Sequence, residues 1–145
     1  MEIPIYVTTE EVKRVCRALD IRDWAGLTEA KVLPNEAEKI LVEVKPVGMN
    51  IDLKEFQSGL EVELEHGLHD PEVNVTNNHP ILTGRIVLAH LKESLDYYKR
   101  LEVAELEGDM LKAAVAKNTA KVEAIYRRLV QAKRVLAEME ADQLA

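Results

Sequence analysis

The sequence contains little of what marks disulfide-bonded, metal-thiolate or membrane-spanning proteins. Its 145 residues include one cysteine, Cys16, which excludes an intramolecular disulfide and a cysteine-rich metal site. Helical spacing with Val12 and Leu19 predicts that Cys16 is a small core residue. No apolar run approaches the roughly 20 residues that span a bilayer, so we expect no membrane contact. No basic, apolar signal segment opens the chain, and we therefore expect a cytoplasmic protein.

An excess of positive charge is also lacking. The chain has 19 Lys and Arg against 26 Asp and Glu, a net charge of −7. Sequence-independent binding to a phosphate backbone needs clustered Lys and Arg. The basic residues near the C-terminus are interspersed with Glu123, Glu138 and Glu140, which is typical of a solvated helix face. We therefore expect no nucleic-acid partner.

The N-terminal third contains helix-start signals. Thr8 and Glu11 have capping-box spacing and predict a helix from about Thr9 to Leu19. Before it, alternation of Ile3, Ile5 and Val7 suits a short strand or an extended arm over residues 1–7.

Residues 35–45 fit two kinds of secondary structure. A capping-box pattern over residues 35–38 and the helical spacing of Ile40, Leu41 and Val44 favour a helix that Pro46 ends. Ile40, Val42 and Val44 also alternate, as in a strand. We favour the helix.

Two further helices follow. Asp52 starts one, and Gly67 stands where a left-handed C-cap is needed. A polar loop follows, and Thr83 is expected to cap a helix that continues through Tyr98. The predicted fold is mainly α, with a small helical domain over residues 1–100.

The C-terminal segment, residues 101–145, has a heptad pattern. No proline interrupts it, and it predicts one long helix for oligomerisation; folding back onto earlier helices is the alternative. Asn118, polar within the seam, is expected to fix register or oligomer number. The seam comprises Leu101, Ala104, Gly108, Leu111, Val115, Asn118, Val122, Ile125, Leu129, Ala132, Leu136 and Met139. The residues expected to make the oligomer contact are Leu111, Val115, Asn118, Val122, Ile125, Leu129, Leu136 and Met139.

Two pairs of side chains can bind an ion. Glu63 with His66, and His90 with Glu93, lie three residues apart on their helices, so each pair can reach one ion. Imidazole and carboxylate suit zinc, iron or manganese, and two His with two Glu predict a mononuclear site. Alternatively, Glu63 and Glu93 pair with His90, Arg85 or loop amides without metal. No residue is predicted to be catalytic.

The same stretch resembles a domain family of unknown function found in bacteria, archaea and phages. The resemblance is carried by Gly59 to Gly67 (GLEVELEHG), Asn74 to Thr76 (NVT) and Thr83 to Leu101 (TGRIVLAHLKESLDYYKRL). An acidic pair of the family pattern is Asn78-His79 here. If that pair completes a metal site, then either part of the site is lost or His79 substitutes. Residues 23–50 read as an insertion relative to the family.

The sequence therefore predicts a non-enzymatic, self-associating structural or interaction protein. Its partners would be itself or the neighbouring proteins of an assembly, such as a phage particle, in which case it would lie within a virion. The alternative is a divalent-metal-binding helical protein, conceivably a metal-dependent enzyme.

Overall fold

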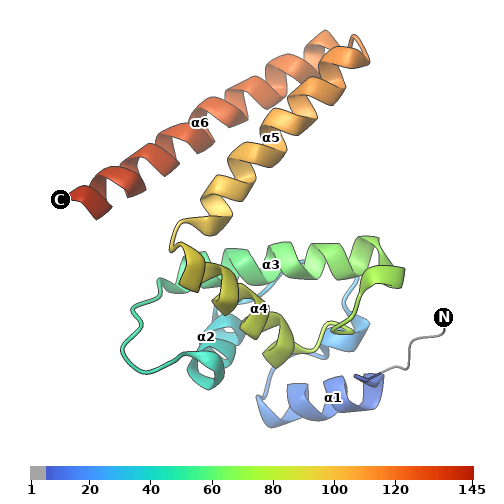
Figure 1. Ribbon diagram of the computed structural model, residues 1–145. Helices are drawn as coiled ribbons and strands as arrows, with labels where there is room; N and C mark the ends of the chain where they lie inside the picture. Colours follow the sequence, from blue (N-terminus) through green and yellow to red (C-terminus); the bar gives the residue numbers. More distant parts are fainter. Residues whose placement is uncertain (1–5) are drawn as a thin grey trace. The chain divides into compact units, whose positions relative to one another are not determined.

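The computed structural model describes residues 6–145 as two compact helical units (Figure 1). Unit 1 is Met1–Glu93 and unit 2 is Ser94–Ala145. Within the described residues every regular element is a helix. The mainly helical fold with a small helical domain and a long C-terminal helix is thus confirmed. The strand or arm expected over residues 1–7 falls mostly on residues 1–5, outside the described part of the chain.

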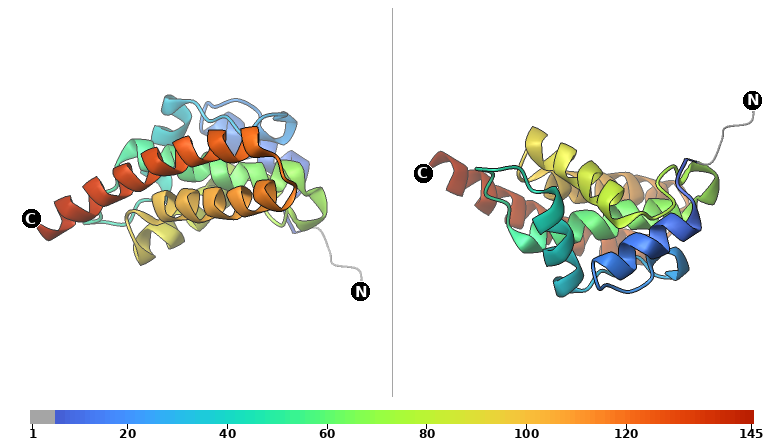
Figure 2. Two further views of the ribbon diagram at one scale, coloured as in Figure 1. Left: turned by 90° about the horizontal axis from the view of Figure 1, so that it is seen from above. Right: turned by 90° about the horizontal axis from the view of Figure 1, so that it is seen from below.

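Unit 1 contains four α-helices and two short 3-10 turns among its described residues. Helices α2, α3 and α4 pack against one another, and α1 packs against the first 3-10 turn and α4 (Figures 1 and 2). The elements are α1 Thr9–Ala18, η1 Trp24–Gly26, α2 Pro34–Val44, α3 Leu53–His69, η2 Pro71–Val73 and α4 Pro80–Glu93.

The core of unit 1 is closely packed where α4 crosses α2. A Cβ added at Gly84 would lie 2.7 Å from Ile40 Cγ2 and 3.4 Å from the Phe56 ring. Glycine at this position therefore allows the backbone of α4 to approach two buried side chains. Trp24 and Cys16 are also buried, which confirms Cys16 as a core residue.

Helix α2 confirms the helical interpretation of residues 35–45, although its cap differs from the prediction. Glu36 is buried, and its carboxylate accepts the Leu33 N–H at 2.9 Å. The same carboxylate accepts Arg22 Nε at 2.8 Å and Arg22 Nη2 at 2.7 Å. Burial alone raises the pKa of Glu36, but these hydrogen bonds hold it below its ordinary value. Glu36, and not Glu38, therefore supplies the carboxylate that caps the N-terminus of α2.

Two predicted helix boundaries are wrong. Gly67 does not end α3, which continues to His69. A Cβ at Gly67 would lie 2.5 Å from Asn78 Oδ1, so glycine at this position leaves room for the loop that follows α3. Thr83 does not begin α4, because the helix starts at Pro80. The His79 imidazole caps it instead, with Nδ1 accepting the N–H groups of residues 81 and 82 at 3.2 and 3.4 Å.

The helix expected from Thr83 through Tyr98 is interrupted at residues 94–96. Asp96 is buried there, and its carboxylate accepts the Ser94 hydroxyl together with Arg100 Nε at 2.9 Å and Arg100 Nη2 at 2.8 Å. The adjacent Arg100 holds the pKa of Asp96 below its usual value. Gln143 Nε2, 3.4 Å from Asp96, ties the end of the chain to the same carboxylate.

Unit 2 is an antiparallel hairpin of α5 Tyr97–Val115 and α6 Thr119–Leu144 (Figures 1 and 2). The long C-terminal helix is α6, and it begins at Thr119 rather than near residue 101, because residues 116–118 form a turn. Lys117 is left-handed, with φ of 54°, and the Asn118 N–H bonds to Ala113 O at 3.0 Å while the Lys117 N–H bonds to Ala114 O at 2.9 Å. These two bonds form a Schellman ending. Asn118 then caps α6 by accepting the Lys121 N–H at 3.0 Å.

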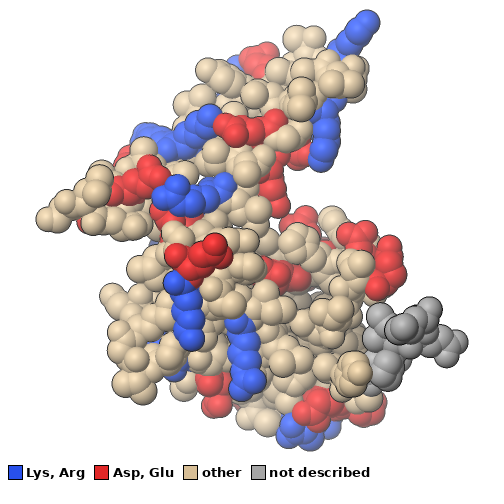
Figure 3. Space-filling model, in the orientation of Figure 1, with Lys and Arg blue, Asp and Glu red and all other residues tan. Residues whose placement is uncertain are grey.

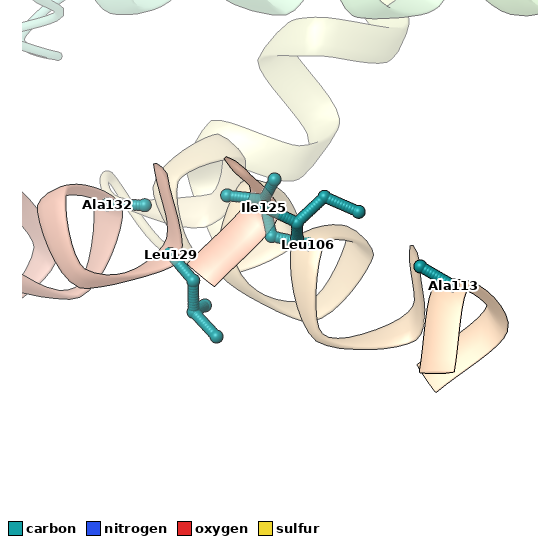
Figure 4. Packing of buried hydrophobic residues seen from close by; sticks show 5 residues of the cluster. All are labelled: Leu106, Ala113, Ile125, Leu129 and Ala132. Atoms are coloured by element: carbon teal, nitrogen blue, oxygen red, sulfur yellow. The ribbon is translucent and has the colours of Figure 1, made fainter. Parts of the chain in front are cut away.

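One short seam holds the hairpin together, with Val103, Met110 and Val122 half-buried at its edge. Its fully buried members, shown in Figure 4, are Leu106, Ala113, Ile125, Leu129 and Ala132.

Candidate functional site

The structure brings together three of the four side chains predicted to bind metal. Glu63 on α3 lies between two imidazoles: His66 Nδ1 is 3.9 Å from Glu63 Oε2, and His90 Nε2, from α4, is 3.6 Å from Glu63 Oε1. The Glu63 side chain is 14% exposed and that of His66 is 63% exposed. The packing of α3 on α4 thus joins residues 24 or more positions apart.

A pocket of about 280 Å³ opens beside Glu63 and His66. Its lining residues come from α3, α4 and the loop between them. Asn74 shapes this loop: its Nδ2 donates to Gly67 O at 3.1 Å and to Asn78 Oδ1 at 2.9 Å. The lining residues are Glu63, His66, Gly67, Val73, Asn74, Val75, Thr76, Thr83 and Ile86.

Glu63 is the shared partner of the group, because each imidazole approaches a different oxygen of its carboxylate. In residues 6–145, no three His, Cys, Asp or Glu side chains form a group that could hold a metal ion as they stand. Glu93 is exposed at the end of α4. The arrangement as it stands suits contact of one carboxylate with two imidazoles, one from the same helix and one from α4.

His79 has a structural role. Its Nδ1 is occupied by two backbone N–H groups at the start of α4. Burial lowers its pKa, with Arg14 and Arg85 acting in the same direction and Glu11 opposing. A neutral imidazole is therefore favoured at the start of α4. The sequence contains a signal for this role, because Asn78-His79 stands directly before Pro80, the first residue of α4.

The second candidate site is the hairpin. The seam predicted on α6 faces α5, with Ile125 and Leu129 buried and Val122 at the edge. On α5, however, the buried face is that of Leu106 and Ala113. The seam residues predicted there point elsewhere: Leu111 is 67% and Val115 is 76% exposed.

One side of the hairpin is apolar. We call it the apolar flank, and its members are spaced by three and four on both helices, which places each set along one helix face. They are Ala104, Glu107, Leu111, Ala114 and Val115 on α5, and Tyr126, Val130, Lys133 and Ala137 on α6, all exposed. Lys133 Nζ lies 2.6 Å from Glu107 Oε1, so the two sets lie on the same side of the hairpin. These two charges neutralise each other, and the other seven members are uncharged.

The opposite side of the hairpin, the charged flank, is different in composition. Its exposed members are Glu102, Glu105, Asp109 and Lys112 on α5, and Lys121, Ala124, Arg128 and Gln131 on α6. On the face drawn in Figure 3, acidic and basic side chains of unit 2 lie among one another. Unit 2 holds nine of the 26 acidic and nine of the 19 basic residues, so its net charge is zero and unit 1 carries the entire −7.

Sequence comparison assigns the chain to a family. The profile described as Protein of unknown function (DUF5661) matches residues 12–107, about two-thirds of the chain. The chain belongs to this family. The DUF5661 match spans the Glu63 site and ends within α5, so α6 lies outside it. No curated protein and no solved structure matches the chain. Over residues 6–145, no helix combines the length and apolarity needed to cross a membrane.

Proposed function

We propose that the protein is a non-enzymatic structural or interaction component that associates with itself through unit 2. Its setting would be a larger assembly, of which a phage particle is one example. The observation that carries the proposal is the apolar flank: Leu111, Val115, Tyr126 and Val130 are each more than half exposed on one side of a hairpin. Contiguous exposed apolar surface bounded by polar residues is typical of protein contacts.

The net charges of the two units also support association through unit 2. Two copies of a unit with no net charge approach without net repulsion, whereas unit 1, which carries −7, remains solvated. Acidic surface favours solubility of each copy. The two units thus have different surface chemistry, and the family match ends inside the unit that we assign to association.

The proposal predicts that stability depends on protein concentration. If unfolding also dissociates copies, the melting temperature rises as concentration is raised, because association stabilises the folded state by mass action. Circular dichroism melts of the full chain over a hundredfold concentration range test this. A melting temperature that stays constant over that range would contradict self-association.

A second candidate function rests on Glu63. His66 and His90 come from different helices and both contact this one carboxylate. A rotation of the exposed His66 side chain would bring Glu63, His66 and His90 together as three ligands for zinc, iron or manganese. Glu93, three residues after His90, would be the fourth ligand. Activation of a bound water beside the pocket would make this a metal-dependent enzyme.

Elemental analysis of protein purified without chelator tests the second candidate. The site predicts close to one equivalent of metal, lost in the His66→Ala, His90→Ala double variant and kept in the His69→Ala variant, whose imidazole lies outside the group. Metal below about 0.1 equivalents in the unaltered protein would remove this candidate.

A further inference from the structure

We infer that the apolar flank binds the apolar flank of a second copy, so that two hairpins form an antiparallel four-helix bundle. This inference rests on the proposed self-association and adds the surface, the number of copies and the symmetry. An antiparallel pair of helices with one apolar side is half of such a bundle. Charge, core size and spacing favour a second copy over another protein.

The charges on the flank complement themselves. Between residues 104 and 137 its charged members are Glu107 and Lys133, which lie 2.6 Å apart across the hairpin; at its end Arg100 pairs with Glu140 at 2.8 Å. A two-fold axis parallel to the helices places α5 of one copy over α6 of the other. Glu107 then faces Lys133 of the second copy, and the same contact occurs twice, as an isologous interface requires. A strongly charged partner would find no matching excess of charge on this surface.

The core of unit 2 is small for its length. Five buried apolar residues, two of them alanine, form the cluster between helices of 19 and 26 residues, with Val103, Met110 and Val122 half-buried beside it. Two helices alone share a single seam, whereas four helices enclose a core on several sides. Burying Leu111 and Tyr126 against a second copy would add large apolar side chains to this core.

The spacing of the flank also matches a bundle. Residues 104, 107, 111 and 114 on α5 and residues 126, 130, 133 and 137 on α6 repeat at steps of three and four. This is the periodicity that packs neighbouring helices side by side over several turns. The apolar flank therefore presents a second seam, parallel to the one that already joins α5 to α6.

Sedimentation velocity of full-length variants tests the inference. Leu111→Lys and Val130→Lys place a charge on the apolar flank and should weaken the dimer at least tenfold in Kd. Gln131→Lys, one residue further on α6 but on the charged flank, is the matched control and should leave the dimer unchanged. Circular dichroism checks that each variant keeps its helices. If a lysine variant does not fold, the Leu111→Ala, Tyr126→Ala double variant replaces it, with the same weakening expected.

The possible results separate the inference from the proposed function. Dimers in the unaltered protein and in Gln131→Lys, with monomers in both flank variants, support both. Association that survives Leu111→Lys and Val130→Lys, or an oligomer larger than two, overturns the inference and leaves self-association standing. A monomer at every concentration in the unaltered protein overturns both.

Discussion

At the scale of single residues, unit 1 depends on buried polar side chains that accept hydrogen bonds at the starts of its helices. Glu36 accepts hydrogen bonds from Arg22 and from the start of α2. His79 accepts two from the start of α4. Each satisfies backbone donors that a helix leaves open in its first turn. These two residues should therefore contribute measurably to the stability of the fold.

Replacing Glu36 by Gln should lower the free energy of unfolding by about 2 kcal/mol, because hydrogen bonds to a charged acceptor become weaker ones. Urea unfolding at neutral pH measures this. Glu38→Gln, two residues later and exposed, is the control and should change stability by less than about 0.5 kcal/mol. Equal effects of the two substitutions would contradict the assigned role of Glu36.

His79 should make stability depend on pH. Its pKa is lowered in the folded state, so the unfolded chain binds the proton more readily, and stability rises with pH through this window. The contribution is fully present above about pH 6.5, the ordinary value for histidine, and declines as the pH falls below it.

The His79→Asn variant isolates this effect. Asparagine keeps a cap acceptor but does not titrate. Urea unfolding between pH 5 and 8 should therefore show a smaller slope of stability against pH in the variant. An unchanged slope would show that His79 does not titrate differently on folding.

At the scale of elements, helix ends decide the architecture. Lys117 occupies the left-handed position between α5 and α6, where glycine is the usual residue. Lys117→Gly should stabilise the chain by about 1 kcal/mol, since a residue with a Cβ is strained there. Lys117→Ala keeps the Cβ and should give no such gain in urea unfolding. A loss of stability in Lys117→Gly would contradict the hairpin turn.

Replacing each of two helical glycines by alanine should change stability in opposite directions. Gly84→Ala should cost about 1 to 3 kcal/mol, because its Cβ would meet Ile40 Cγ2 at 2.7 Å. Gly108→Ala has open space around the new Cβ and should gain about 0.5 to 1 kcal/mol from higher helix propensity. Thermal unfolding of both variants compares a position of α4 that packs on α2 with a position of α5 where an added Cβ would meet no other atom.

Helices were more predictable than their ends. The spacing of Val12, Val15 and Cys16 identified α1, and that of Ile40 and Leu41 identified α2, because burial on one face requires this periodicity. The turn at Lys117 was not predicted, since neither glycine nor proline marks it and the heptad pattern appears continuous through it. On α5 the pattern through Leu111 and Val115 was apolar too, so spacing alone could not tell which of two stripes the hairpin buries.

The candidate site was partly predictable as well. Spacing along the sequence paired Glu63 with His66, but the approach of His90 to the same carboxylate depends on how α3 packs on α4, a contact that one-dimensional spacing does not determine. The sequence predicts His79 as a ligand only if the acidic pair of the family pattern completes a metal site. In the structure its Nδ1 faces the start of α4, next to the left-handed residues Asn77 and Asn78.

At the scale of the whole molecule, net charge is divided unequally between the two units. Unit 1 carries the entire −7, while unit 2 is neutral and has the apolar flank. This unequal charge suits a protein whose copies meet through one unit and present the other. The central claim is that this meeting occurs between two copies in solution.

The most direct test of this claim is the mass of the intact protein in solution, measured by light scattering over a range of concentrations. The account predicts a mass that rises toward twice the 16.4 kDa of one chain as concentration increases. A mass that remains at 16.4 kDa throughout would contradict it.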